Sequence, residues 1–248
     1  MEIAEHIAAL RNDGELFAKA AAAVAPDAPI PTCPEWTMRD LVVHQGQVHR
    51  WATANVAHPS SEPADAAEVM GPEPADAMLV DWFRYGHQGL VDALESAEPD
   101  VACWAFMAAP SPLAFWARRQ CHETGMHRAD AESASGPISP FPADVAVDGI
   151  DELLRAFITR PGGRLKSERP RTLLARSTDT GDDWLVRISS DDVVTDRVAG
   201  AADCTVSGAA SDLHLFLWNR IGADALAVDG DRSVLDLWRG SVTIRWGR

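Results

Sequence analysis

The chain of 248 residues carries a net charge of −15 at pH 7, and its calculated pI is about 4.8. A chain this acidic lacks the basic surface with which proteins bind phosphate backbones, so we expect no nucleic-acid partner. Hydrophobic residues make up 46% of the sequence, enough for the core of one large domain or of two ordinary ones. All but two of the 22 basic residues are arginine, a composition typical of GC-rich genomes such as those of actinomycetes.

The sequence favours a cytoplasmic protein without membrane segments. No run approaches the roughly 18 apolar residues of a membrane-spanning helix. Glu2 and Glu5 interrupt the first residues, so these residues do not have the pattern of a secretion signal. The four cysteines are scattered without a CxxC pair, which predicts reduced thiols. Cys121 could serve as a nucleophile, but its position about 200° around a helix from Glu123 favours a buried structural thiol.

Apolar residues recur at helical spacing in four stretches of the first half of the chain. These predicted helices cover residues 2–25, 37–57, 76–97 and 112–134. The second has a strong start, because Thr37 is a natural N-cap and Asp40 occupies the third helical position of a capping box. Together the four helices predict an antiparallel-type bundle. The Pro- and acid-rich loop 58–75 either forms one wall of a cleft or is mobile.

The composition changes at the Pro-rich segment from Gly136 to Pro142, which predicts a linker between domains 1–138 and 143–248. Short strand-like runs between Asp/Gly/Ser turns make the second domain α+β, with a mostly antiparallel sheet. Its predicted elements are a helix at 144–159, strands at 171–177, 184–189, 192–198 and 203–207, a helix from Ser211 to Arg220, an extended segment at 225–231, a helix ending near Trp238 and a strand from Ser241 to Trp246.

A carboxylate and an imidazole four residues apart, Glu123 and His127, form the first candidate site. Positions i and i+4 of a helix lie one above the other, so these side chains share one face. They are either an ion pair on a solvated surface or two ligands of a divalent metal. His44 is the upstream candidate for a third ligand, because it lies on the same helical face as Leu41 and Val48.

The surroundings of this pair favour a buried site. One continuous helical face of the predicted fourth helix carries Trp116, Gln120, Glu123, His127 and Asp130. A buried carboxylate on such a face needs a partner. Gln120 or Asp130 could orient His127, or either could be an ordinary polar residue of the bundle. His87 in the predicted third helix is either a further ligand or a packing histidine.

Three segments carry a resemblance to a known family. The run from Pro31 to His44, followed by Val48 to Trp51, resembles the first signature of the mycothiol-dependent maleylpyruvate isomerase family. The run from His122 to Glu132 is similar to the second signature of that family. The C-terminal stretch from Val206 to Arg220, followed by Gly230 and Asp231, is similar to its C-terminal domain.

The resemblance implies a DinB-like four-helix metal-binding domain and a smaller, sterol-carrier-like α+β domain. It also implies a zinc site made by His44, Glu123 and His127, and mycothiol as co-substrate. Arg220 matches the position at which the family is expected to hold a substrate carboxylate. Judged from its place near a helix C-terminus, Arg220 is equally an arginine that caps backbone carbonyls.

Three protein ligands with nitrogen and oxygen donors leave coordination positions open, as in a catalytic zinc site, although other divalent metals suit the same ligands. An open zinc deprotonates a bound thiol or water. Together with the family resemblance, this ligand set implies an isomerase or S-transferase that acts on a small electrophile. A hydrolase on the same ligands and a non-catalytic metal- or ligand-binding module remain the alternatives.

Overall fold

The computed structural model describes residues 1–160 and 162–242. Its backbone divides into two compact units, the first from Met1 to Ser139 and the second beginning at Pro140. None of the described helices is long and apolar enough to cross a membrane. The predicted fold class, a helical bundle followed by an α+β domain, is confirmed.

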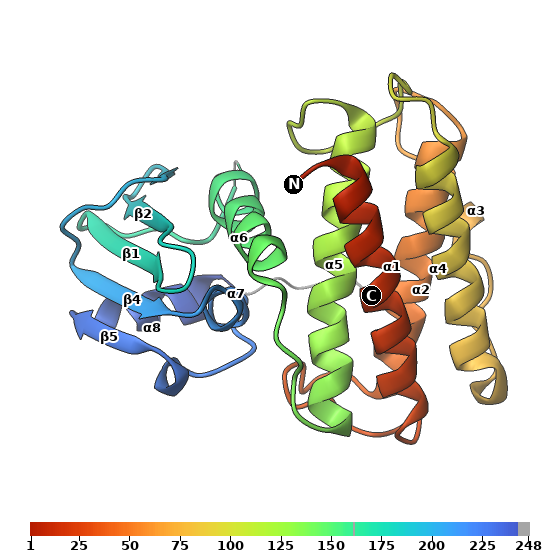
Figure 1. Cartoon of the computed structure of the whole chain (residues 1–248), viewed down its shortest axis with the longest axis horizontal. Coiled ribbons are helices and arrows are strands. Elements are labelled where there is room, and N and C mark those ends of the chain that lie inside the picture. The colour runs from red at the N-terminus through yellow and green to blue at the C-terminus, as the bar shows by residue number, and fades with distance from the viewer. Residues whose placement is uncertain (161, 243–248) are drawn as a thin grey trace. The chain divides into compact units, whose positions relative to one another are not determined.

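Four long helices lie side by side in the first unit (Figure 1). They are α1 (Ile3–Ala22), α2 (Met38–Ala57), α4 (Leu79–Ser96) and α5 (Pro112–Ser135). Helix α1 packs on α4 and α5, and α2 packs on the same two helices. Large apolar side chains such as Phe17, Leu41 and Phe83 are fully buried between them. Removing such side chains from water is the main stabilising contribution to the bundle.

The predicted start of α2 is confirmed. The Thr37 hydroxyl accepts a hydrogen bond from the Asp40 amide, and the Asp40 carboxylate accepts one from the Thr37 amide. This reciprocal pair satisfies two backbone donors that no helical carbonyl reaches. The cap therefore fixes the residue from which α2 begins and, with it, the orientation of His44 two turns later.

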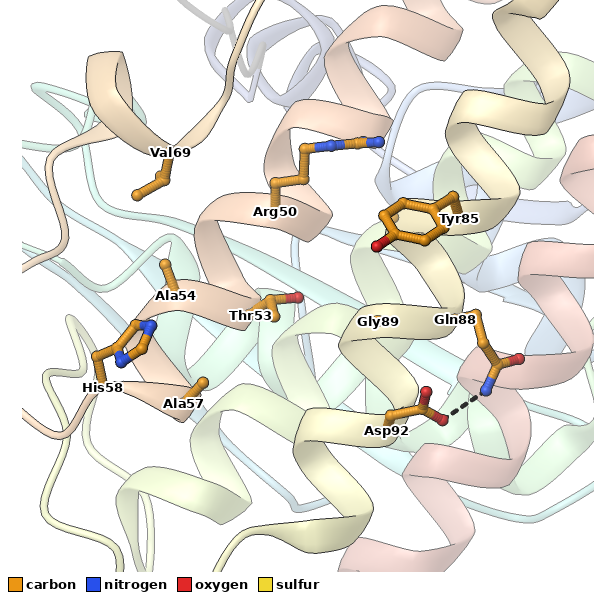
Figure 2. A pocket seen from close by; sticks show the side chains of 11 residues that line it. Arg50, Thr53, Ala54, Ala57, His58, Val69, Tyr85, Gln88, Gly89 and Asp92 are labelled. Carbon is orange, nitrogen blue, oxygen red and sulfur yellow. Dashed lines mark hydrogen bonds between the residues drawn. The ribbon is translucent and has the colours of Figure 1, made fainter.

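The loop 58–75 is more ordered than a simple connector. It contains the one-turn helix α3 (Ala66–Val69), and the 3₁₀ turn η1 (Asp76–Met78) leads into α4. Two hydrogen bonds attach it to α2, from Trp51 Nε1 to the Ala64 carbonyl and from the Ala64 amide to Asn55 Oδ1. The loop contributes Val69 to a pocket between α2 and α4 (Figure 2), so it does form one wall of a cavity.

The second unit contains a five-stranded sheet in the order β3-β2-β1-β4-β5. Its strands are β1 (Arg171–Ser177), β2 (Asp183–Ile188), β3 (Val193–Asp196), β4 (Cys204–Gly208) and β5 (Ala227–Gly230). Only the β1–β4 pair is parallel among the described strands, so the predicted mostly antiparallel sheet is confirmed. Helices α7 (Ala210–Leu217) and α8 (Ser233–Ser241) pack on β1.

Two predictions for the second unit need correction. The expected helix 144–159 is α6 (Ala143–Asp151), which continues as the π-helical turn η2 (Glu152–Phe157). Periodicity alone does not distinguish an α-helix from a π-helical turn, because both carry apolar residues every three to four positions. The predicted strand from Ser241 to Trp246 is wrong at Ser241, which ends α8, and its part beyond Val242 lies outside the described residues.

A shared arginine connects α1 to α5. Arg128 Nε lies 3.2 Å from Asp13 Oδ1, and its Nη1 donates to Glu132 Oε2 at 2.8 Å. All three side chains are buried. Burial raises the pKa of Asp13 to about 6, since the opposing charge of Arg128 is divided between two carboxylates. One guanidinium thus serves as the counter-charge for two helices.

Asp13 should make the bundle less stable as the pH rises. The folded protein keeps this proton up to about pH 6, whereas an unfolded aspartate releases it near 3.8. The free energy of unfolding should therefore fall across that window, by on the order of 3 kcal/mol from this group. Asp13→Asn should lack this component, which urea unfolding between pH 4 and 7 measures. Parallel pH profiles for the two proteins would contradict the assignment.

Candidate metal centre

Three side chains that the sequence singled out converge in the bundle. The ligand atoms of His44, Glu123 and His127 all lie within 4.8 Å of one another. Glu123 Oε1 is 3.6 Å from His44 Nε2 and 3.4 Å from His127 Nε2. Helix α2 supplies the first residue, and two successive turns of α5 supply the other two. The solvated-surface interpretation of the Glu123–His127 pair is wrong, since both residues are buried.

The spacing of these atoms suits a shared metal ion. Two ligands that bind one zinc ion at about 2.0–2.2 Å and the tetrahedral angle lie about 3.3–3.6 Å apart. The distances from Glu123 Oε1 to the two imidazoles, 3.6 and 3.4 Å, match that separation. They are longer than the usual 2.7–3.2 Å of an N–H···O hydrogen bond. The residues present therefore fit a divalent metal with two nitrogen ligands and one oxygen ligand.

Arg119 orients the carboxylate of Glu123. Its Nη2 donates to Glu123 Oε2 at 2.9 Å, which leaves Oε1 directed to the two imidazoles. Burial raises the pKa of Glu123, but the neighbouring imidazoles of His127 and His44 and the charge of Arg119 outweigh it and hold the pKa well below its ordinary value. The carboxylate is therefore ionised, as a metal ligand must be.

Asp130 fixes the ring of His127. Its Oδ2 lies 2.9 Å from His127 Nδ1, and its Oδ1 accepts a hydrogen bond from the Thr32 hydroxyl. An Nδ1–H that donates to Asp130 leaves the Nε2 lone pair of His127 for a metal. Burial lowers the pKa of His127, but the hydrogen bond to Asp130 and the neighbouring carboxylate of Glu123 outweigh that effect and raise the pKa. Of the two orienting residues that the sequence offered, Asp130 makes this contact.

Trp36 covers one side of the cluster. Its ring lies 4.9 Å from the His44 ring and is stacked at 6.0 Å on the His127 ring, centroid to centroid. The side chain of His44 is 17% exposed, compared with 2% for His127, so His44 is the open edge of the site. Burial also lowers the pKa of His44, which keeps its imidazole neutral and able to bind a cation.

The charges around the site favour a cation. Glu123 and Asp130 bring two buried negative charges, and Arg119 brings one positive charge. With neutral imidazoles this group keeps an excess of one negative charge in a low-dielectric environment, which is costly unless a cation offsets it. Helical periodicity pointed to Asp130 but did not point to Arg119. Its position four residues before Glu123 was the signal that could have identified it.

His87 belongs to a different cluster. Its ring is stacked on Phe83 and lies 5.3 Å from His49. His49 is fully buried and lies 2.8 Å from the Thr124 hydroxyl. Burial, followed by the neighbouring His87, lowers the pKa of His49 well below its ordinary value. Of the two interpretations of His87, packing is therefore the one that its contacts support.

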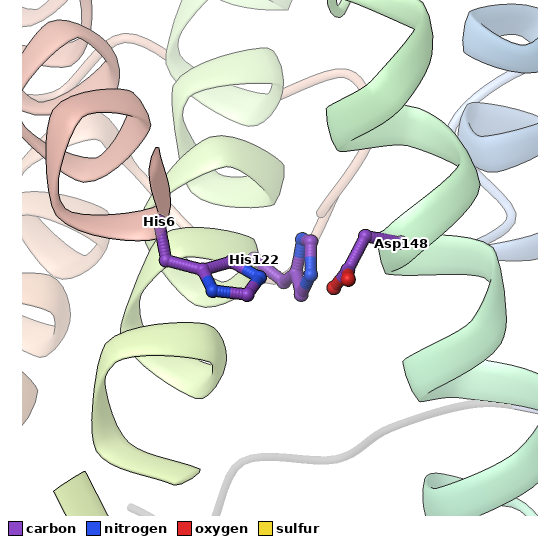
Figure 3. Close-up of side chains that lie close together, drawn as sticks. All are labelled: His6, His122 and Asp148. Carbon is purple, nitrogen blue, oxygen red and sulfur yellow. The ribbon is translucent and has the colours of Figure 1, made fainter. Parts of the chain in front are cut away.

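Two further residues near the second signature, His122 and Cys121, are buried. His122 of α5 and His6 of α1 are both buried, and their rings meet edge to face at 5.9 Å (Figure 3). Cys121 is fully buried, as expected for a structural thiol.

Arg220 lies in the second unit, just after α7. The backbone there turns sharply, with Asn219 at a φ of 61°, and the Arg220 amide donates to the Leu215 carbonyl. Arg220 Nη1 donates to the Trp218 carbonyl at 2.8 Å, and the side chain is half-buried. Arg220 thus makes the carbonyl-capping contact that its position near a helix end allowed, and its guanidinium geometry also suits a carboxylate.

Comparisons with known proteins agree with this fold. Residues 7–132 match the mycothiol maleylpyruvate isomerase N-terminal domain, and residues 144–237 match the C-terminal domain of the same family. A crystal structure of the mycothiol-dependent maleylpyruvate isomerase, and one of a histidine-to-alanine mutant of that enzyme, each superpose with a TM-score of 0.62. Both are 14% identical over 92% of this chain and 93% of theirs. No curated protein matches the sequence.

The family match covers both compact units, and the N-terminal match alone spans more than half of the chain. The first match includes the helices that carry His44, Glu123 and His127. The chain belongs to the mycothiol-dependent maleylpyruvate isomerase family.

Proposed function

We propose that the protein is a zinc-dependent enzyme that uses mycothiol to isomerise a small electrophile or adds mycothiol to it as an S-transferase. The observation that carries this proposal is the convergence of His44, Glu123 and His127 in a chain of this family. A purely structural zinc site would have four protein ligands, whereas these three leave room for a thiol. Maleylpyruvate is the first substrate to test, because the related solved structures are named for it.

When bound, zinc would supply a Lewis acid beside which a coordinating thiol is deprotonated. The residues of the chain prepare that site. Arg119 and Asp130 hold Glu123 and His127 in fixed orientations, so little reorganisation is needed at the moment of reaction. Trp36 excludes water from one side, and the exposed edge of His44 is where a small thiol would approach.

The two reactions differ in what happens to the carbon–sulfur bond. In isomerisation, the thiolate adds to an activated double bond, the new single bond rotates, and the thiolate leaves as the double bond forms again. In transfer, the carbon next to the new bond takes up a proton and the adduct is released. The first reaction returns the thiol unchanged and the second consumes one thiol for each product.

Asp130 should determine how tightly the site binds metal. Asp130→Asn removes the charged acceptor that orients His127, and loss of such a partner usually weakens zinc binding about 10–100-fold. Competition with a chromogenic chelator measures this change. Asp81→Asn, on the exposed surface of α4, is the matched control and should bind zinc as the wild type does. Equal affinities for the two variants would contradict the proposed ligand set.

His44→Ala should abolish both stoichiometric zinc binding and turnover. Elemental analysis of protein prepared without chelators reports the metal, and assays of maleylpyruvate and other small electrophiles with mycothiol report the reaction. Thiol titration then separates isomerisation from transfer. His58→Ala removes an exposed histidine at the end of α2 and should change neither. Turnover by the His44→Ala protein would overturn the proposed mechanism.

We also propose that Arg220 binds a carboxylate of the substrate. In a protein of net charge −15, an anionic ligand needs a local cation to offset the field of the protein. Arg220→Lys keeps the charge but loses the two-pronged geometry, so it should weaken turnover of acidic substrates and leave zinc content unchanged. Steady-state kinetics with urea unfolding as a control checks this. Unchanged kinetics would make Arg220 a structural carbonyl cap.

A further inference from the structure

The bundle has a second candidate site on a different face of α2. Arg50 lies six residues after His44, about 240° further around the helix, so it points away from the metal cluster. A pocket of about 530 Å³ lies there between α2 and α4 (Figure 2). This volume is within the range of about 300–1,000 Å³ that is typical of small-molecule sites. Neither the metal ligands nor Arg220 line it.

We propose that this pocket binds a small monocarboxylate with an apolar body, its carboxylate on Arg50. Three small apolar residues of the lining, Ala54, Ala57 and Val69, form one side. Tyr85 and Gly89 of α4 face them, as Figure 2 shows. The pocket therefore has a cationic end and a body lined by methyl groups and one aromatic ring, which is the composition that suits such a ligand.

The guanidinium of Arg50 is fixed in place by its neighbours. It lies 3.7 Å from the centroid of the Trp82 ring, Nη1 donates to the Gly46 carbonyl and Nη2 donates to the Trp82 carbonyl. These bonds use two of its five N–H donors. No carboxylate within the described residues lies at ion-pair distance from it, although the protein is strongly acidic. A fixed guanidinium without a counter-charge is a strong recognition site for a carboxylate.

Two glycines make this arrangement possible. A Cβ at Gly86 would lie 2.5 Å from Arg50 Nη1, and a Cβ at Gly46 would lie 2.1 Å from the Trp82 ring. The guanidinium and the indole therefore occupy space that any other residue would fill. The packing of these neighbours therefore restricts the rotamer of Arg50.

The far end of the pocket limits the charge of the ligand. Asp92 lies there, and its Oδ1 accepts a hydrogen bond from the Gln88 amide at 2.6 Å. One guanidinium facing one carboxylate within the same pocket suits a ligand with a single negative charge. A phosphate dianion would be repelled by Asp92 more strongly than a single carboxylate would be.

Gly89 provides a test that does not disturb the fold. A Cβ at this position meets no heavy atom within 4 Å, so a larger side chain would extend into open space in the pocket. Replacing a glycine inside a helix also lowers the conformational entropy of the unfolded chain and usually stabilises the protein. Gly89→Leu should therefore fill the pocket while the protein stays folded. Ala8→Leu places the same side chain on the exposed surface of α1 as a matched control.

Tyr85 gives a signal that reports on this pocket alone. It is the single tyrosine of the chain and is 82% exposed. Protein labelled with ring-¹³C tyrosine should therefore show one set of tyrosine resonances. Titration with benzoate and with hexanoate should shift this set in a saturable way. Benzamide and hexanamide, which lack the charge, should bind at least about tenfold more weakly, a difference of about 1.4 kcal/mol.

The variants determine where the probes bind. Gly89→Leu should lose the carboxylate-dependent shift and Ala8→Leu should keep it. Arg50→Lys, which loses the two-pronged geometry, should weaken binding of the carboxylates more than that of the amides. Equal affinity for acids and amides, no saturable shift in the wild type, or an unchanged titration of Gly89→Leu would each overturn the proposal. These readouts depend on neither zinc content nor turnover, so the site can fail independently of the proposed enzymatic function.

Discussion

Burial of charged side chains along α5 is the constraint on which the first unit depends. Every residue from Arg119 to Glu132 on this helix is buried, and several of them are ionisable. An ionised group inside a protein is tolerated only when a partner of opposite charge and hydrogen bonds replace its water. Helix α5 meets that requirement mainly within itself, because Arg119 pairs with Glu123 and Arg128 pairs with Glu132, each one turn away.

The candidate metal centre follows from the same requirement. Glu123 satisfies one carboxylate oxygen with Arg119 and presents the other to His44 and His127. Asp130 is the second buried carboxylate, and it satisfies His127 and Thr32. With both imidazoles neutral the group holds one more negative than positive charge, and a divalent cation at the three converging atoms would offset it. The pairing that stabilises the fold also orients the side chains of the candidate metal centre.

Helix α2 joins the two candidate sites of the bundle. His44 on one face completes the metal cluster, and Arg50 on another face defines the pocket against α4. The capping box at Thr37 and the packing of Gly46 on Trp82 fix the register of the helix between them. A change that rotated α2 would therefore disturb both sites, whereas Gly89→Leu alters the pocket alone.

The sequence by itself determined the helices of the bundle and which of their side chains share a face. Helical spacing placed Glu123 and His127 on one face, and the cap at Thr37 set the start of α2, because both depend on residues within one or two turns. Strands β1 and β4 were predicted nearly to the residue, since alternation and turn residues are also local signals.

The features that depend on long-range packing could be determined only from the tertiary structure. Burial of the Glu123–His127 pair, the selection of Asp130 over Gln120 and the separation of His87 from the cluster all depend on which helices meet. The same holds for the Arg50 pocket. In the sequence, Gly46 and Gly86 are only glycines that lower helix propensity, whereas the structure shows that they make room for Trp82 and Arg50. Periodicity shows which side chains share a face, whereas the partner of that face is set by contacts between residues far apart in the chain.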